Sequence, residues 1–552
     1  MICRSNSGII PKDALHTYQL APWTHDEVIE YLLARHRDRC ASVMQRCRNA
    51  SDNESLRGHP ELWRHITDVL AADDRILNIK DALRQVVAAR LPDGIARELA
   101  ANWCLAILMG NTKLGAAFRT RLEPVCDFRH LLRLLWHVPV LLILASERIA
   151  EELRTGKAYP ALEHVLPREL VLECASLIRN DAIVLDRLKN IIQSRSRDMH
   201  PMASSLLHAA KVGWQPDPPE SSGWRKLLPQ QRILGPRLYK AYLQDAKWPG
   251  IVLNHVELSH ADLSGADLTG ANLDDAFVNF ANLRGTTLAG AGLGRVNAEE
   301  ACLVDADLSS ARADRGVFQT VNAERASFEG ATLEQASFQG ANLKGANFTR
   351  ANLTRANLTL ADIEDAVFAQ AQLRHARLNG LMLRSADFRH CSFSFAQMRG
   401  CDLESMVLPG VDFRKAKLNG SLFTGSIMPR ASFRAAKLVN TGLAEIEWEY
   451  VDLRGADLRG ASFHMGSSRS GLVDSPIASL GTRTGFYTDD YNEQDFKSPE
   501  EIRKANLRGA DLRGANIAGV DFYLVDLRDA LYDATQEQQL RSTGAILESR
   551  VR

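Results

Sequence analysis

An apolar residue recurs at every fifth position of the chain from Leu253 to Phe463, without a change of register. This region contains 43 such positions, and 35 of them are Leu or Phe, so the position has a nearly fixed requirement for a large apolar side chain. A small or apolar residue, most often Ala, stands two positions earlier, and the other three positions are polar, charged or Gly. Residues 341–360, ANLKGANFTRANLTRANLTL, show the pattern in its plainest form.

A period of five matches neither the turn of an α-helix nor the two-residue alternation of a half-buried strand. It suits a four-sided coil, in which each side takes five residues and turns its apolar residue and the preceding small residue inward. Such coils stack through backbone hydrogen bonds at a spacing of roughly 4.8 Å, and the region is long enough for about eleven of them. A disordered low-complexity segment is disfavoured, because it needs no apolar residue at every fifth position.

The repeated phrase A(D/N)LXX resembles the repeats of the pentapeptide repeat family. The resemblance covers residues 251–463 and implies a solenoid of the right-handed quadrilateral β-helix type for them. In such a solenoid, function is sought where the repeat is interrupted or carries unusual side chains.

Residues that are 20 apart should lie above one another on the same side of successive coils. Two neighbouring inward columns then contain phenylalanines, at Phe328, Phe348, Phe368 and Phe388 and at Phe393, Phe413 and Phe433. We expect these rings to form the solenoid core and to stiffen it by stacking. Ala298, Ala313 and Ala323 instead predict a thin and loosely packed interior in their part of the solenoid.

The register breaks after Phe463, and residues 464–503 contain no repeat and are rich in Ser, Gly and Asp. The phrase resumes in a new phase at Leu507, which predicts final coils over residues 504–535 and a C-terminal tail over residues 536–552. A loop of this length in a rigid solenoid is a candidate functional element, and we interpret it as solvated and partner-facing.

The first half of the chain follows a helical period. THDEVIEYLLARH predicts a helix with Thr24 as N-cap, and HPELWRHITDVL predicts another with Pro60 as its first helical residue. We predict an α-helical domain over residues 1–214, a linker over residues 215–232 and a helical cap of the solenoid over residues 233–250. The predicted fold class is therefore α+β, with an all-α domain followed by the quadrilateral β-helix.

A second resemblance lies near the N-terminus. ICRSN at residues 2–6, YQLAPWTHDEVIEYL at 18–32 and GHPELW at 58–63 are similar to the late, helical part of NACHT/STAND-type signalling NTPases. This resemblance implies that the chain begins inside an ATPase domain. No GxxxxGK[ST] phosphate-binding motif occurs in the sequence, so it does not imply ATP hydrolysis.

Composition adds little that would point to chemistry. The nine cysteines show no metal-ligand spacing, and the sequence contains no HExxH, GxSxG or GxGxxG motif in a suitable context. We therefore predict no catalytic residue, no metal site and no cofactor. The apolar window at residues 134–145 is short and contains His137 and Pro139, which predicts a buried helix and no membrane span. The sequence favours a cytoplasmic protein that is not an enzyme.

One surface position changes character along the solenoid. On one side, the residue after the inward position is acidic at Asp274, Asp314 and Glu334 and basic further on, at Arg374, Arg414, Arg434 and Arg454. Lys415, Lys417 and Lys437 add to the basic part. Cations one coil apart repel each other unless they are screened or bound by an anion. This candidate interaction stripe is therefore either a solvated face or a docking surface for an acidic partner or a nucleic-acid backbone.

These features favour a non-enzymatic scaffold or adaptor that presents a rigid β-helical surface to an unknown protein partner and takes no small-molecule substrate. A second hypothesis is a regulatory module or fragment of a STAND-type NTPase that lacks its P-loop. A third follows the pentapeptide repeat proteins that imitate DNA and bind gyrase. That role relies on a strongly acidic rod, whereas residues 251–463 contain 25 acidic and 21 basic residues. A nucleic-acid partner is also disfavoured, because the 67 basic and 67 acidic residues of the chain balance.

Overall fold

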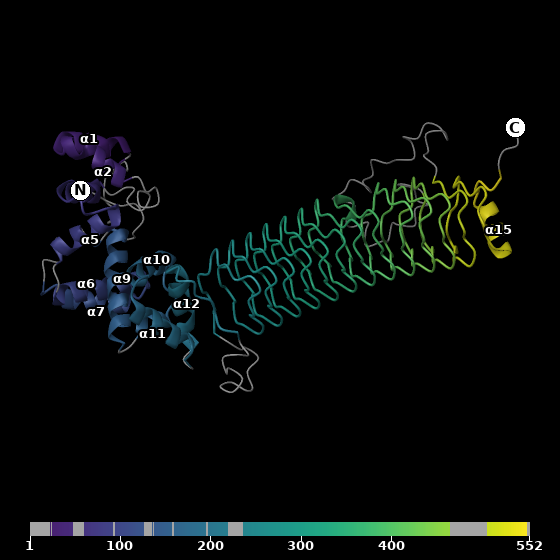
Figure 1. Cartoon of the computed structure of the whole chain (residues 1–552). Helices are drawn as coiled ribbons and strands as arrows, with labels where there is room; N and C mark the ends of the chain where they lie inside the picture. Colours follow the sequence, from purple (N-terminus) through teal and green to yellow (C-terminus); the bar gives the residue numbers. More distant parts are fainter. Residues whose placement is uncertain are drawn as a thin grey trace. The chain divides into compact units, whose positions relative to one another are not determined.

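The chain divides into two compact units, Met1–Val212 and Gly213–Arg552 (Figure 1). The computed structural model describes residues 23, 25–47, 60–91, 94–125, 135, 137–156, 159–194, 197–218, 236–463 and 505–548. The predicted insertion at residues 464–503 lies outside the described residues.

The first unit is helical. Its α-helices are α1 His25–Arg35, α2 Cys40–Arg46, α4 Pro60–Ala72, α5 Ile79–Arg90, α6 Ile95–Leu108, α7 Thr112–Leu122, α9 Val138–Thr155, α10 Arg168–Ile178, α11 Ala182–Ile192 and α12 His200–Ala209. Short 3-10 helices connect some of them, η1 Arg37–Arg39, η2 Pro160–Glu163 and η3 Arg197–Met199. Helix α6 packs against α7 and α9, α10 packs against α9 and α12, and α4 packs against α5. As the sequence predicts, α4 begins at Pro60 and α1 begins directly after Thr24.

The apolar window of the first unit enters α9 at Val138, and its residues from there on form the beginning of this helix. Pro139 stands in the first turn of this helix, and Val140 and Leu144 are fully buried. Nearby, α5 and α10 are joined by Glu173, whose side chain is 9% exposed and pairs with Arg84 and Lys80. Among the described residues, no helix has the length and apolar character required to cross a membrane.

The second unit is a stack of coils held by parallel pairing at a spacing of 20 residues. Val252 pairs with Asn272, Asn272 with Gly292, and the series continues along the solenoid. Pairs also begin at Arg237, Tyr242 and Lys247, so each coil pairs along four columns five residues apart. The described residues pair only through these isolated bridges. Strands of greater length are absent among them, because each side of a coil is only five residues long. The pentapeptide region thus implies a β-helix.

Backbone hydrogen bonds explain why the phrase needs five residues. On the side centred on Leu253, the Leu253 N–H donates to the Asn272 carbonyl at 2.7 Å and the His255 N–H donates to the Asp274 carbonyl at 2.9 Å. The Val256 N–H returns to the Leu253 carbonyl at 3.2 Å and closes the turn to the next side. Position five of the phrase has a positive φ, 59° at His255. The outward side chains are therefore held at fixed heights by inter-coil bonds.

Four sides can be distinguished by their inward residues. Side 1 has Leu373, Phe393, Phe413, Phe433 and Leu453, and side 2 has Leu378, Met398, Leu418, Leu438 and Leu458. Side 3 has Leu383, Leu403, Phe423, Leu443 and Phe463, and side 4 has Phe388, Leu408, Met428 and Trp448. The regular turn of side 3 is replaced once by a 3-10 turn, η4 Leu383–Ser385.

Stacked phenylalanines fill the interior. The seven predicted rings, Phe328, Phe348, Phe368, Phe388, Phe393, Phe413 and Phe433, are all buried. On side 4, Phe348 stacks on Phe328 with ring centroids 4.7 Å apart and on Phe368 at 4.8 Å. On side 1, Phe433 stacks on Phe413 at 4.9 Å, and Trp448 of side 4 stacks on Phe433 at 4.5 Å.

Two of the three inward alanines have large neighbours in the same coil. Ala313 and Ala323 flank Phe318, which packs edge-to-face against Phe328 across the interior with centroids 6.3 Å apart. The next coil also has two opposed rings, Phe338 and Phe348, but it has Leu333 and Leu343 on its other two sides. Ala313 and Ala323 therefore place less side-chain volume in their coil than the two leucines do in the next one, and the expectation of a thinner interior at this level stays a prediction.

The N-terminal end of the solenoid differs from the predicted helical cap over residues 233–250. Residues 236–250 already form coil sides, and Leu238, Leu243 and Trp248 are inward residues with at most 2% exposure. Trp214, which precedes the predicted linker, packs edge-to-face on Trp248 with centroids 5.9 Å apart. Among the described residues, Trp214 is thus the side chain that packs on Trp248 at this end of the solenoid, and residues 236–250 form no helix.

The C-terminal end also differs, because the predicted tail over residues 536–552 contains helix α15, Ala534–Ser542. Leu540 of α15 is fully buried in the solenoid core. The Gln536 side-chain amide donates to the carbonyls of Leu512 and Ala515 at 2.9 and 2.8 Å. Helix α15 thus covers the apolar interior, and Gln536 satisfies the Ala515 carbonyl, for which no backbone donor is present among the described residues.

Candidate functional site

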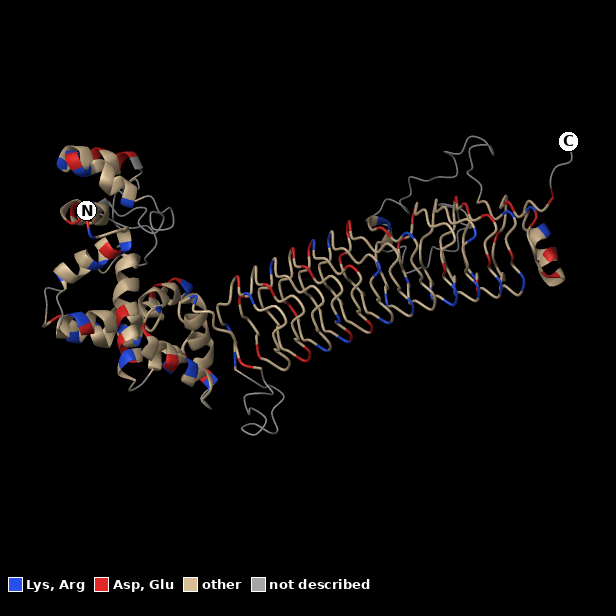
Figure 2. Cartoon of the chain, viewed as in Figure 1, with Lys and Arg blue, Asp and Glu red and all other residues tan. Residues whose placement is uncertain are grey.

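The surface of the solenoid is strongly polarised over the four coils of residues 371–450. On sides 1 and 2 the outward positions carry eight cations and one carboxylate, Asp412. The cations are all exposed, and we call this surface the basic face; they are Arg374, Arg377, Arg399, Arg414, Lys415, Lys417, Arg434 and Lys437. Figure 2 shows Lys and Arg recurring along the lower edge of the solenoid towards its C-terminal end.

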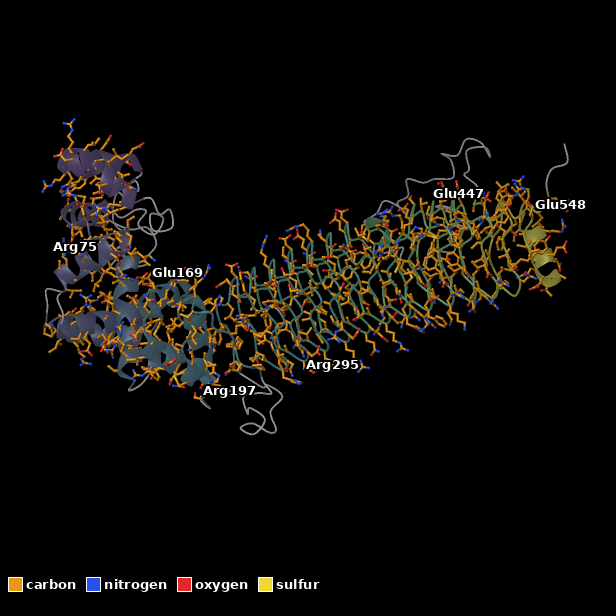
Figure 3. The ribbon with its side chains drawn as sticks, viewed as in Figure 1. Arg75, Glu169, Arg197, Arg295, Glu447 and Glu548 are labelled. Atoms are coloured by element: carbon orange, nitrogen blue, oxygen red, sulfur yellow. The ribbon has the colours of Figure 1, made fainter. Side chains whose placement is uncertain are left out.

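Sides 3 and 4 of the same coils have the opposite balance. Their outward positions carry six carboxylates, Asp387, Asp402, Glu404, Glu445, Glu447 and Glu449. They carry three arginines, Arg384, Arg389 and Arg430. In Figure 3, Arg295 of side 1 projects from the lower edge of the solenoid and Glu447 of side 4 lies at the upper edge. The positive charge is therefore a property of one face and not of the whole solenoid.

Two arginines of the predicted stripe are bound by carboxylates of their own phrase. Arg414 donates from Nε and Nη2 to the two carboxylate oxygens of Asp412, at 2.9 and 2.8 Å. Its backbone N–H also donates to Asp412, at 3.0 Å. Arg454 binds Asp452 in the same way, at 2.8 and 2.7 Å. We call this Asp-Leu/Phe-Arg arrangement a clasp. At these two positions of the predicted stripe, the counter-ion of the arginine is therefore an aspartate of the chain itself.

Clasps dominate the coils that follow the basic face. Beyond residue 450 they form at Asp452–Arg454, Asp457–Arg459, Asp511–Arg513 and Asp526–Arg528. Asp511 also lies 3.5 Å from Arg454 of the preceding coil. These coils contain arginines without an excess of positive charge, so Arg454, which the sequence placed in the stripe, lies beyond the basic face.

The remaining cations of the basic face form no ion pair among the described residues, although Lys437 helps to lower the pKa of Asp457, its bridge partner in the next coil. Arg434 follows Ser432 where a clasped arginine follows Asp, and Arg374 follows Gln372. Seven cations are left without an ion pair, Arg374, Arg377, Arg399, Lys415, Lys417, Arg434 and Lys437. The sequence prediction identified five of these and missed Arg377 and Arg399, because only one outward position was followed along the whole solenoid. Reading the side-2 positions at spacing 20 reveals both.

An aromatic ladder runs through the basic face at the corner between sides 1 and 2. His375 stacks on Phe395 with centroids 4.6 Å apart. The Lys415 ammonium lies 5.2 Å from the Phe395 centroid, and the Arg374 guanidinium lies 5.3 Å from it. Burial, together with the neighbouring Arg374 and Arg355, lowers the pKa of His375, which favours the neutral form of this imidazole. Phe395 thus fixes two cations of the face by cation–π contact.

The clasps predict that the solenoid loses stability in acid. Hydrogen bonds from Arg454 and Arg513 lower the pKa of Asp452 and Asp511. A carboxyl whose pKa is lower in the folded state stabilises the fold above its unfolded pKa of about 4, and this contribution is lost as the pH falls further. We expect the Tm, followed by circular dichroism, to fall between pH 5 and pH 3. The variant Asp452→Asn, Asp511→Asn should fall less, and an equal decrease would contradict this origin.

Among the described residues, no group of His, Cys, Asp and Glu side chains is arranged to hold a metal ion. Burial raises the pKa of the Cys391 and Cys401 thiols to about 12, and each thiol donates to a backbone carbonyl. These two cysteines are structural residues of the solenoid interior.

Comparisons with known proteins agree with the repeat. A family model described as pentapeptide repeats matches in eight copies, over residues 237–275, 279–312, 326–365, 366–404, 408–443 and 502–530. The match begins at residue 237, where the structure also begins its coils. The resemblance of residues 2–6, 18–32 and 58–63 to NACHT/STAND-type NTPases is not shown by these findings and stays a prediction; residues 2–6, 18–22 and 58–59 lie outside the described residues.

Several solved structures are similar to parts of the chain. A pentapeptide repeat protein from the thylakoid lumen of Arabidopsis thaliana is 29% identical over 20% of this chain and 68% of its own, with a TM-score of 0.16. HetL from the cyanobacterium Nostoc sp. strain PCC 7120 is 21% identical over 56% of this chain and 93% of its own, with a TM-score of 0.15. QnrB1, a plasmid-mediated fluoroquinolone resistance protein, is 16% identical over 55% and 94%, with a TM-score of 0.19. No curated protein matches the chain.

Proposed function

We propose that the chain is a non-enzymatic scaffold or adaptor whose solenoid, a right-handed quadrilateral β-helix, docks a protein partner on the basic face. The observation that supports this proposal is the separation of charge around the coils of residues 371–450. Eight cations and one carboxylate lie on sides 1 and 2, and six carboxylates and three arginines lie on sides 3 and 4. The equal numbers of basic and acidic residues in the chain could be spread evenly around the coils, so this separation of charge is a feature of its own.

Rigidity makes this surface suitable for recognition. Each side is bonded to the coils before and after it, and stacked Phe393, Phe413 and Phe433 lie directly beneath side 1. The backbone therefore holds the cations at fixed spacings. The conformational entropy lost when a partner binds is small for this reason. Charge complementarity of this kind speeds encounter and selects among partners.

The same charge distribution supports protein docking over imitation of DNA. A DNA mimic presents acidic side chains along its surface, whereas the most polarised face of this solenoid is basic. No observation among the described residues favours the NTPase-module hypothesis, which stays without support from the first unit.

Affinity capture from a lysate of the native host tests the proposal. The wild-type chain is compared with the face variant Arg377→Glu, Arg434→Glu, Lys437→Glu. The matched control is Asp452→Asn, Arg454→Gln, which removes a whole clasp on the same side without changing the net charge. We expect the face variant to lose specific proteins that the wild type and the control both retain. Recovery of the same proteins by all three chains would contradict docking on the basic face.

A further inference from the structure

We infer that the basic face recognises an acidic, extended polypeptide segment that runs along the stack over sides 1 and 2 of residues 371–450. This inference rests on the proposed docking function and names the chemistry of the partner. Three features of the structure lead to it: the limited length of the unpaired charge, the covered faces of Phe395 and the clasps that adjoin the site.

The unpaired charge has two ends. Towards the C-terminus it stops after Lys437, because Arg454, Arg459 and Arg513 are each held in a clasp. Towards the N-terminus the side-1 corner carries Glu334, which lies 3.7 Å from Arg355. The free cations thus span four coils, or three inter-coil steps of about 4.8 Å, roughly 15 Å. An extended polypeptide rises about 3.3 Å per residue, so about five residues cover the site.

Unpaired cations at this spacing need a counter-charge. Arg377, Lys417 and Lys437 occupy the same outward position of side 2, and Lys417 and Lys437 are on consecutive coils. Side chains one coil apart repel each other, and carboxylates placed between them remove the repulsion and add charge-assisted hydrogen bonds. A segment with several Asp or Glu residues supplies these groups at the required density.

Phe395 favours a polypeptide over a single-stranded nucleic acid. Single strands bind by stacking their bases on open aromatic faces. The faces of the Phe395 ring are engaged by the stacked His375 ring and by the Lys415 ammonium. The half-buried rim of the ring remains for contact with the aliphatic part of a side chain. Phe395, the aromatic residue at the centre of the basic face, therefore offers no open ring face on which a nucleic-acid base could stack.

Asp412 offers a variant that should strengthen binding. Its carboxylate is the one acidic group on the basic face, and it neutralises Arg414. Asn fits the same position, because Asn342 of side 3 accepts the Lys344 N–H at 3.2 Å as Asp412 accepts the Arg414 N–H. Asp412→Asn therefore keeps the turn, opens the clasp and adds a free arginine to the site.

Fluorescence anisotropy with the full chain tests the inference. The probe is a labelled peptide of eight glutamates at low salt, with an unlabelled twelve-nucleotide oligothymidine and a twelve-base-pair DNA duplex as competitors. We expect the peptide to bind, the variant Arg434→Gln, Lys437→Gln to weaken binding by about 5- to 10-fold and Asp412→Asn to tighten it by about 3-fold. The clasp control Asp452→Asn, Arg454→Gln should stay within about 2-fold of the wild type.

Each other outcome overturns the inference. Stronger competition by either nucleic acid than by unlabelled peptide assigns the face to nucleic acid. No binding of the peptide, or equal weakening by the face variant and the clasp control, removes the acidic segment as the ligand. If the capture experiment still loses proteins with the face variant, the docking function survives and only the acidic segment is wrong. If capture is also unchanged, the docking function fails as well.

Discussion

Replacing Phe348 with alanine should lower the free energy of unfolding of the solenoid by about 3–5 kcal/mol. The Phe348 ring is fully buried, stacks on Phe328 and Phe368 and meets Phe338 edge-to-face at 5.7 Å. Neighbouring coils are held by inter-coil hydrogen bonds and cannot move inward to fill the space, so the substitution leaves a cavity. Hydrogen exchange measured by mass spectrometry should show faster exchange in the coils that contain these rings.

Two control variants distinguish the effect of a buried cavity on stability from the effect of removing an aromatic ring. Phe348→Leu should cost much less than Phe348→Ala, because Leu268, Leu288 and Leu308 fill the same column in other coils. Phe280→Ala removes a ring that is 43% exposed and should change stability by less than about 1 kcal/mol. Equal effects of Phe348→Ala and Phe280→Ala on exchange and stability would contradict a close-packed interior.

The columns of the solenoid could be predicted because one position in five tolerates almost nothing but a large apolar residue. A single error in register would turn Phe348 and its neighbours to solvent, so the period alone assigns the inward residues. The five-residue period does not show how side chains from opposite sides of a coil pack against each other in the interior. That Phe318 and Phe328 lie on opposite sides of one coil and meet edge-to-face follows from the structure and not from the period.

The basic stripe was predicted in part for a related reason. Spacing 20 brings Arg414 and Arg434 to consecutive coils, which the sequence alone reveals. The clasp depends on a shorter relation, because the residues before and after an inward residue point to the same surface. Asp412 and Arg414 therefore meet within one phrase, whereas Ser432 leaves Arg434 free.

Both ends of the solenoid were predicted less well than its middle. Residues 233–250 contain Leu238, Leu243 and Trp248 at the five-residue period, but their outward positions lack the usual Asp or Asn and resemble a helix. Helix α15 has few apolar residues, so its period is weak. Its start is nevertheless marked by the capping box of Asp533 and Gln536, a signal that the sequence offers and the prediction did not use.

Removing helix α15 should make the solenoid associate end to end. Truncation after Asp533 removes α15 together with Ile546, which pairs with Asp526, and exposes the interior of the last coil, where Leu540 now fills the core. It also frees the carbonyl of Ala515, which Gln536 satisfies, whereas the Leu512 carbonyl keeps the Ala515 N–H at 2.9 Å. An open coil offers unpaired backbone groups and an apolar surface to a second copy, as an uncovered sheet edge does. Sedimentation equilibrium should show a concentration-dependent increase in mass for the truncated chain over the full chain.

Point variants test whether the covering depends on the buried face of α15. Leu540→Asp places a carboxylate in the core and should detach the helix, which would reproduce the association of the truncated chain. Gln538→Asp introduces the same charge at an exposed position of α15 and should behave as the wild type. Both variants keep the full length of the chain. A difference in sedimentation between them would therefore show that the packing of α15 on the core, and not only the presence of the segment, prevents association. If the truncated chain and Leu540→Asp sediment as the wild type does, the last coil is closed by its own backbone and α15 is dispensable.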